Sequence, residues 1–212
     1  MEKVIKMKKI DHKKELSTFY KQPKNKISIV ELPTLQFLMI DGKKDPNNSP
    51  EYSDAVGALY AIAYKLKFMI KKSSLEINYS VMPLEGLWWA EDMSQFTLDN
   101  RENWLWTMMI MQPDFVTQDM FIDAVEIAKK KKDNPLIDSV RFSTFSEGSC
   151  MQIFHQGPYG EGEIETIAKL HQKIEEEGFK KTGKHHEIYF NSPLKTTPEN
   201  LKTIVRQPIT AK

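Results

Sequence analysis

The sequence predicts an α+β domain made of two pseudo-symmetric modules, each an antiparallel sheet backed by helices, with a central ligand cleft between them. Two observations support this prediction. Short segments rich in β-branched and aromatic residues, bounded by proline and glycine, alternate with segments whose apolar residues recur at helical spacing. The same order of predicted elements also occurs twice along the 212 residues, which indicates an internal duplication.

The first repeat is expected over residues 27–113, after an N-terminal extension of residues 1–26 that includes a short helix at 11–20. Ser49 is a suitable cap for the long helix of this repeat, and Pro50 suits its first turn. The predicted elements are strands at 26–32 and 35–40, a helix at 50–70, and strands at 74–84 and 103–113.

The second repeat is expected over residues 118–210 and follows the same plan. Its strand around Tyr189 ends in a proline in the same way as the first-repeat strand around Tyr79, so the two tyrosines occupy equivalent places. The predicted elements are a helix at 117–132, strands at 139–145 and 149–156, a helix at 164–174 that stops near Gly178, and strands at 186–194 and 201–208.

Composition limits the classes of function. The 30 basic and 29 acidic residues give a net charge of +1, so there is no electrostatic footprint for nucleic acid. Cys150 is the only cysteine, which excludes an internal disulfide and fits a reducing compartment. Residues 1–16 lack the apolar core of a signal peptide, and no apolar run approaches the ~20 residues of a membrane span. We therefore expect a cytoplasmic protein without a membrane segment.

The segment 184–208 contains the most informative carboxylate. In a strand, alternate side chains share a face, so His185, Glu187 and Tyr189 are expected to lie together. An acid beside aromatic groups can bind a cation or activate a water, and in an apolar pocket its pKa is expected to rise. A strand carboxylate can equally be an ordinary charge on a solvated sheet face.

The four tryptophans, Trp88, Trp89, Trp104 and Trp106, lie close together in the first repeat. With neighbouring methionines such as Met108 they could form an adaptable pocket for flat ligands, although plain core packing explains large apolar residues equally well. Trp88 and Trp89 are expected in a loop or at a sheet edge. The histidines show no metal-ligand spacing, so we predict neither a metal nor another cofactor.

The C-terminal half resembles the GyrI-like (gyrase-inhibitor-like) small-molecule-binding family. The similarity lies in these segments: Phe154–Tyr159, His186–Tyr189, Ser192-Pro193, Pro198-Glu199, Leu201–Thr203 and Gln207-Pro208. It implies two α/β modules around a cleft in which flat, often cationic drugs lie over a central glutamate, here Glu187. It also implies kinship with stand-alone members that hydrolyse cyclopropane-bearing genotoxins. The regulators of the family carry a DNA-binding domain ahead of this module, and about 26 residues are too few for one, so no direct nucleic-acid binding is expected.

On this resemblance we expect a stand-alone hydrolase that binds flat aromatic xenobiotics and opens a cyclopropane ring by adding water. Glu187 and Tyr79 are the predicted catalytic residues, the first activating water and the second donating to a carbonyl oxygen. The predicted ligand-binding residues are Trp88, Trp89, Trp106, Met108, His155 and Tyr189. The alternatives are a non-catalytic protein that sequesters cationic drugs and an inhibitor of a protein partner. We expect a monomer or weak dimer.

Overall fold

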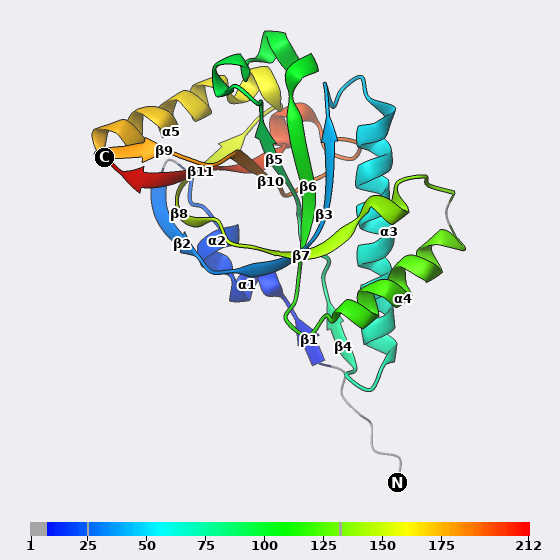
Figure 1. Cartoon of the computed structure of the whole chain (residues 1–212). Coiled ribbons are helices and arrows are strands. Elements are labelled where there is room, and N and C mark those ends of the chain that lie inside the picture. Colours follow the sequence, from blue (N-terminus) through cyan, green and yellow to red (C-terminus); the bar gives the residue numbers. More distant parts are fainter. Residues whose placement is uncertain (1–7, 25, 132) are drawn as a thin grey trace.

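The computed structural model describes residues 8–24, 26–131 and 133–212. The predicted extension at 1–26 falls partly outside these residues, as does Lys132 at the expected end of a helix. The described chain forms one nine-stranded sheet with helices packed on it (Figure 1). Its strands are β2 (Ile27–Leu32), β3 (Leu35–Lys43), β5 (Leu84–Trp89), β6 (Leu105–Gln112), β7 (Arg141–Phe145), β8 (Gly148–Gln156), β9 (Phe179–Lys181), β10 (His185–Tyr189) and β11 (Lys202–Ala211).

The sheet is antiparallel throughout and nearly symmetric in its order. From the central pair β10–β5, the strands run outward as β11, β8 and β2 on one side and as β6, β3 and β7 on the other, with β9 pairing β11. In chain order, one half of the sheet is built from β3, α3, β5 and β6, and the other from β8, α5, β10 and β11. The outermost strands cross over: β2, from the first half of the chain, pairs with β8, and β7, from the second half, pairs with β3. The predicted α+β class is therefore confirmed, whereas an origin by duplication stays a prediction.

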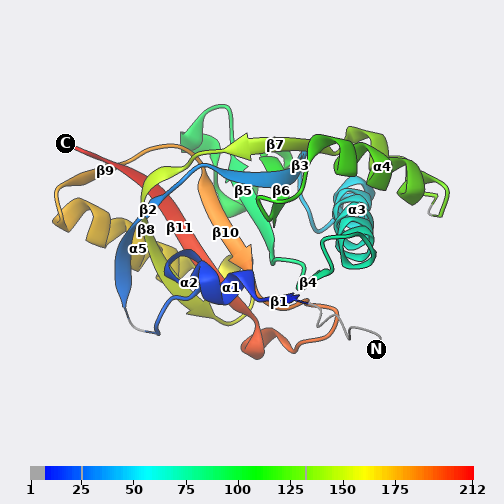
Figure 2. The same ribbon diagram turned by 90° about the horizontal axis from the view of Figure 1, so that it is seen from below.

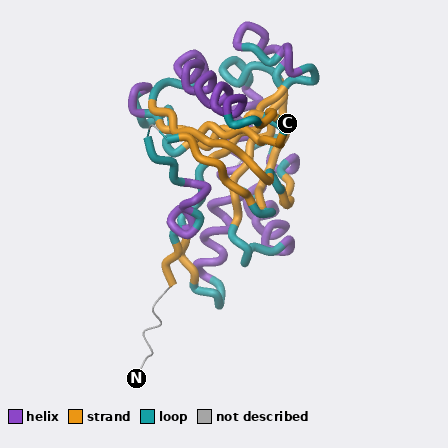
Figure 3. The backbone as a smooth tube through the Cα atoms, turned by 90° about the vertical axis from the view of Figure 1, so that its left-hand side faces the viewer, coloured by secondary structure: helices purple, strands orange, loops and turns teal. Residues whose placement is uncertain are grey.

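The helices lie where the apolar spacing predicted them. α3 packs on β3 and β6, and α5 packs on β8 and β11, so these two helices flank the central strands (Figure 1). Figure 3 shows the helices and strands from the left-hand side of Figure 1. The predicted helix at 11–20 is interrupted at Leu16. Among the described residues, no helix is both long and apolar enough to cross a bilayer. The helices are α1 (His12–Glu15), α2 (Ser17–Tyr20), α3 (Pro50–Lys72), α4 (Gln118–Lys129) and α5 (Ile164–Glu176), with short 3₁₀ turns η1 (Met93–Gln95), η2 (Leu98–Asn103), η3 (Ile137–Ser139), η4 (Gly160–Glu163) and η5 (Pro198–Asn200).

The central strand of the first half differs from the prediction. The expected strand at 74–84 is reduced to β4 (Ile77–Tyr79), which pairs in parallel with β1 (Lys8–Ile10) outside the main sheet. The central strand is instead β5, which contains Trp88 and Trp89, the residues expected in a loop or at an edge. Pro83 has no amide hydrogen and precedes β5, so it separates the short strand from the central one. The apolar run after it has residues suited to a buried strand.

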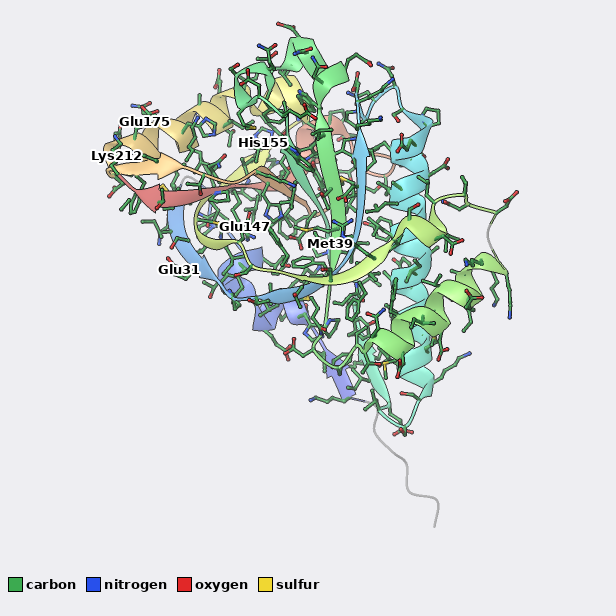
Figure 4. The ribbon with its side chains drawn as sticks, viewed as in Figure 1. Glu31, Met39, Glu147, His155, Glu175 and Lys212 are labelled. Carbon is green, nitrogen blue, oxygen red and sulfur yellow. The ribbon has the colours of Figure 1, made fainter. Side chains whose placement is uncertain are left out.

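A buried polar row crosses the face of the sheet opposite to α3 and α5. Buried His186, Arg206 and Gln152 lie side by side on β10, β11 and β8, and the half-buried Ser28 on β2 ends the row. His186 lies 2.9 Å from Glu147 through Nδ1 and 3.0 Å from Glu85 through Nε2. The Arg206 guanidinium lies 3.3 Å from Glu147. Glu147 comes from the turn between β7 and β8 (Figure 4).

The segment around α2 seals this row (Figure 2). The Tyr20 hydroxyl donates to Glu85 at 2.7 Å, and Arg206 Nη2 donates to the backbone carbonyl of Phe19 at 2.7 Å. Gln152 Nε2 donates to the carbonyl of Thr18 at 3.2 Å. Since buried charges are tolerated only when they are paired and hydrogen-bonded, this segment completes the network and fixes the central strands from behind.

Arg206→Met is expected to destabilise the fold strongly, because it leaves the buried Glu147 without one of its two cationic neighbours. The expected loss is about 3–5 kcal/mol of unfolding free energy. The matched control is Arg141→Met, which removes an exposed pair with Asp41 and should cost less than about 1 kcal/mol. Urea unfolding of both variants checks this, and equal losses would contradict the assignment.

The network also predicts how stability depends on pH. Burial disfavours the charged form of His186, but the carboxyl groups of Glu147 and Glu85 outweigh it and raise its pKa. Because the pKa of His186 is higher in the folded protein than in the unfolded chain, its protonation stabilises the fold. This contribution is complete below the unfolded pKa of about 6.5, and it is lost as the pH rises through the pKa of the folded state. The difference in unfolding free energy between the wild type and His186→Gln should therefore shrink as pH rises above about 6.5. A difference that stays constant would be inconsistent with a charged His186.

Candidate functional site

One large cavity, of about 1560 Å³, lies between α3 and α5 over the central strands β5 and β10. Drug-sized ligands usually occupy sites of about 300–1000 Å³, so this cavity has room for a long or multi-ring molecule. Aromatic side chains gather in its lining. Those nearest the central strands are Tyr52, Trp88, Phe96, Trp104, Tyr159 and Tyr189.

Glu187 lies on the floor of this cavity, on the face of β10 predicted from strand alternation. His185 Nε2 donates to its Oε1 at 2.8 Å, and the Tyr189 hydroxyl donates to its Oε2 at 2.6 Å. The side chain keeps 13% of its surface exposed, so it is accessible from the cavity. Both oxygens are held in place while part of the side chain stays open to the cavity.

The pKa of Glu187 is shifted downward, opposite to the direction expected from the sequence. Burial in the apolar cavity does favour the neutral acid, but the hydrogen bonds from His185 and Tyr189 outweigh it and lower the pKa. Glu187 is therefore a carboxylate at neutral pH. It can accept a proton from water or hold a cation.

Trp88 connects Glu187 to the aromatic wall. Its indole Nε1 donates to the Tyr189 hydroxyl at 3.0 Å, so Trp88, Tyr189 and Glu187 form a hydrogen-bonded chain. The Trp88 ring also packs against Tyr52, with centroids 6.1 Å apart, and against Trp104, at 5.8 Å. The carboxylate therefore lies at the base of a rigid aromatic cluster, which suits a flat ligand.

A second carboxyl group, Glu163, also lines the cavity, at the junction between η4 and α5. Only 1% of it is exposed. Its Oε2 accepts from the Gly160 amide at 2.9 Å. Its Oε1 makes no well-formed hydrogen bond within the described part of the chain, although the Thr203 hydroxyl, which also lacks one, lies beside the carboxyl group. Burial, together with the charge of Glu187, raises the pKa of Glu163 to about 9. At pH 7 Glu187 is therefore ionised and Glu163 neutral.

The structure brings together three of the predicted site residues, Glu187, Trp88 and Tyr189. It does not bring Tyr79 to them. Tyr79 lies on β4, packs edge-on against Phe115 with ring centroids 5.5 Å apart, and is not part of the cavity wall. The position opposite Tyr189 is occupied by Leu84, because the central strand begins only after Pro83.

Four other predicted ligand-binding residues lie outside the wall of the cavity. Trp89 points to the opposite face of β5 from Trp88, and Lys184 Nζ lies 3.2 Å from its ring centroid. Trp106 is fully buried over Gly42, where a Cβ would lie 2.0 Å from the indole, and Met108 is buried beside Gly86 on the neighbouring strand β6. His155 lies 2.9 Å from Thr166 and so ties β8 to α5 (Figure 4).

Sequence reasoning missed Tyr52, Phe96, Tyr159 and Glu163. Tyr52 belongs to the apolar stripe of α3 and looks like a core residue. Phe96 lies in the segment that follows β5, and Tyr159 and Glu163 lie in a glycine-rich turn. No local spacing distinguishes these residues from structural ones, because they meet only when α3 and α5 pack on the same face. Within the described residues, no group of three or more His, Cys, Asp or Glu side chains is arranged to hold a metal ion.

An acidic, aromatic cavity on this sheet defines a small-molecule-binding protein, and the comparisons with known proteins agree. The family described as the GyrI-like small molecule binding domain matches residues 25–210. The chain belongs to this family, as the sequence resemblance predicted. A search of curated proteins finds no match.

The chain is similar to solved structures from Listeria innocua. An uncharacterized conserved protein is 45% identical, with a TM-score of 0.86, and the alignment covers 95% of this chain and 100% of that one. A protein described as a hydrolase is 44% identical, with a TM-score of 0.85, and the alignment covers 96% of this chain and 100% of that one. The C-terminal domain of EcmrR shares the fold at 14% identity, with a TM-score of 0.54 over 88% of this chain and 98% of that domain.

Tyr189→Phe should raise the pKa of Glu187, because it removes the 2.6 Å hydrogen bond to the carboxylate. Tyr79→Phe is the matched control and should leave that pKa unchanged. The measurement is an NMR titration of protein carrying ¹³C-labelled glutamate. An equal effect of both variants, or none of Tyr189→Phe, would contradict the geometry.

Proposed function

We propose that this protein is a hydrolase that binds flat aromatic electrophiles and opens their cyclopropane ring by adding water. The observation that carries the proposal is an ionised, partly exposed carboxylate, Glu187, fixed by His185 and Tyr189 at the floor of an aromatic cavity. The 42% and 44% identical Listeria innocua proteins described as hydrolases support the reaction type.

The chemistry follows from this placement. A planar substrate stacks on the aromatic cluster around Trp88, which holds its strained ring above Glu187. Glu187 accepts a proton from a water molecule as the water oxygen bonds to a ring carbon. The broken carbon–carbon bond gives its electrons through the conjugated system to a carbonyl oxygen. General-base assistance of this kind contributes about 10²–10⁴ in rate, and positioning contributes further.

A second candidate is binding without catalysis. The lowered pKa of Glu187 favours it, because a weakly basic carboxylate suits a bound cation better than proton transfer. The same aromatic cluster would then supply stacking and cation–π energy. The two candidates differ in one observable, the chemical fate of the ligand.

The test is product analysis after incubation with a cyclopropane-bearing DNA alkylator. The wild type should yield the ring-opened product, which has gained one water. Glu187→Gln should bind the compound and turn it over about 10²–10⁴ times more slowly. Glu175→Gln, which alters an exposed carboxylate on α5, is the control and should keep full activity (Figure 4).

Two results would overturn the proposal. Recovery of unchanged ligand from the wild type after long incubation would favour binding without catalysis. Undiminished turnover by Glu187→Gln would remove Glu187 from the reaction.

A further inference from the structure

We infer that Glu163 is the acid of this reaction and donates a proton to the carbonyl oxygen of the substrate while Glu187 takes one from water. This inference rests on the proposed function. It assigns the second carboxyl group of the cavity a role that neither the family resemblance nor the known fold requires.

The position of Glu163 suits a proton donor to a bound ligand. It reaches the cavity from the α5 side, whereas Glu187 reaches it from β10, so a flat molecule on the floor has one carboxyl group from each element. One oxygen of Glu163 is fixed by the Gly160 amide. The other is buried and makes no well-formed hydrogen bond among the described residues, although the Thr203 hydroxyl of β11, which also lacks one, lies beside the carboxyl group. Buried polar atoms with incomplete hydrogen bonds are costly unless a ligand or water completes them.

The surroundings keep Glu163 protonated. Burial and the negative charge of Glu187 both oppose a second carboxylate in the same cavity. The titratable or charged side chains that face this region include Tyr159 and Tyr189, the exposed Glu161 of the same turn, and Arg101 of η2, whose Nη2 would lie 3.3 Å from a Cβ at Gly160. Burial raises the pKa of the two tyrosines, and the glutamates raise it further. His155, behind the cavity on β8, has a pKa lowered by burial and adds no positive charge that would ionise Glu163. Two carboxyl groups with separated pKa values form the usual acid and base pair of a hydrolytic site.

The proton balance of the step then closes. Water loses one proton to Glu187, and its oxygen forms the new bond to carbon. The ring bond breaks, and its electron pair moves through the conjugated system to the carbonyl oxygen. That oxygen takes the proton of Glu163 and becomes a hydroxyl group. The product contains the substrate plus one water, and Glu187 and Glu163 exchange protonation states until solvent or direct transfer restores them.

Glu163→Gln tests the inference, because the amide oxygen can still accept from the Gly160 amide whereas the acidic proton is lost. Its kcat for the alkylator should fall on the order of 10²–10⁴-fold, with little change in substrate affinity. Glu165→Gln alters an exposed carboxyl group in the first turn of α5 and should keep wild-type kcat. Glu163→Asp keeps an acid and should recover part of the lost rate.

The pH profile separates a chemical role from a structural one. The kcat of the wild type should fall as pH rises through about 9, where Glu163 loses its proton. Glu163→Gln should lack that alkaline decline, and Glu163→Asp should retain one. This measurement on the wild type needs no variant to fold.

The outcomes are distinguishable. A wild type that forms product, with a flat alkaline profile or with unimpaired Glu163→Gln, would overturn the role of Glu163 and leave the hydrolase intact. A wild type that forms no product would overturn the proposed function and this inference together.

Discussion

The pairing of β10 with β5 is the constraint on which the rest of the structure depends. Because side chains alternate along a strand, β10 presents His186 to one face of the sheet and Glu187 to the other. On β5, the residue opposite Glu187 is Gly86. A Cβ at this position would lie 2.6 Å from the Trp88 indole nitrogen. The absence of a side chain therefore gives Trp88 the space to reach Tyr189. A shift of one residue in this pairing would exchange the two faces and abolish the site.

Both faces of the sheet carry histidine and glutamate side chains, but these are fully hydrogen-bonded on one face and only partly so on the other. On the back, His186 and Arg206 are paired with carboxyl groups and closed off by the segment around Tyr20, so the charges are fully satisfied. On the front, Glu187 is satisfied by His185 and Tyr189 but keeps part of its side chain open to the cavity, and Glu163 keeps one oxygen without a well-formed hydrogen bond among the described residues. The back therefore holds the central strands still, and the front leaves hydrogen-bonding capacity for a ligand.

Local patterns predicted much of this arrangement. Alternation along residues 185–189 places Glu187 and Tyr189 on one face, and apolar spacing locates α3 and α5. The failure concerned Tyr79, whose similarity in sequence to Tyr189 does not determine which strand enters the centre of the sheet. Burial alone predicts a raised pKa for Glu187, and the hydrogen bonds from His185 and Tyr189 reverse that direction. Glu163 and Tyr52 could not be found from spacing, since the cavity exists only after distant helices pack together.

The most direct test is a crystal structure of Glu187→Gln bound to an unreacted planar cyclopropane substrate. The expected complex has the planar ring of the substrate against Trp88. A water molecule next to the ring carbon that reacts lies about 3 Å from the side-chain amide of residue 187, and Glu163 lies at hydrogen-bond distance from the substrate carbonyl oxygen. A substrate bound outside the cavity, or with its strained ring turned away from residue 187, would contradict it.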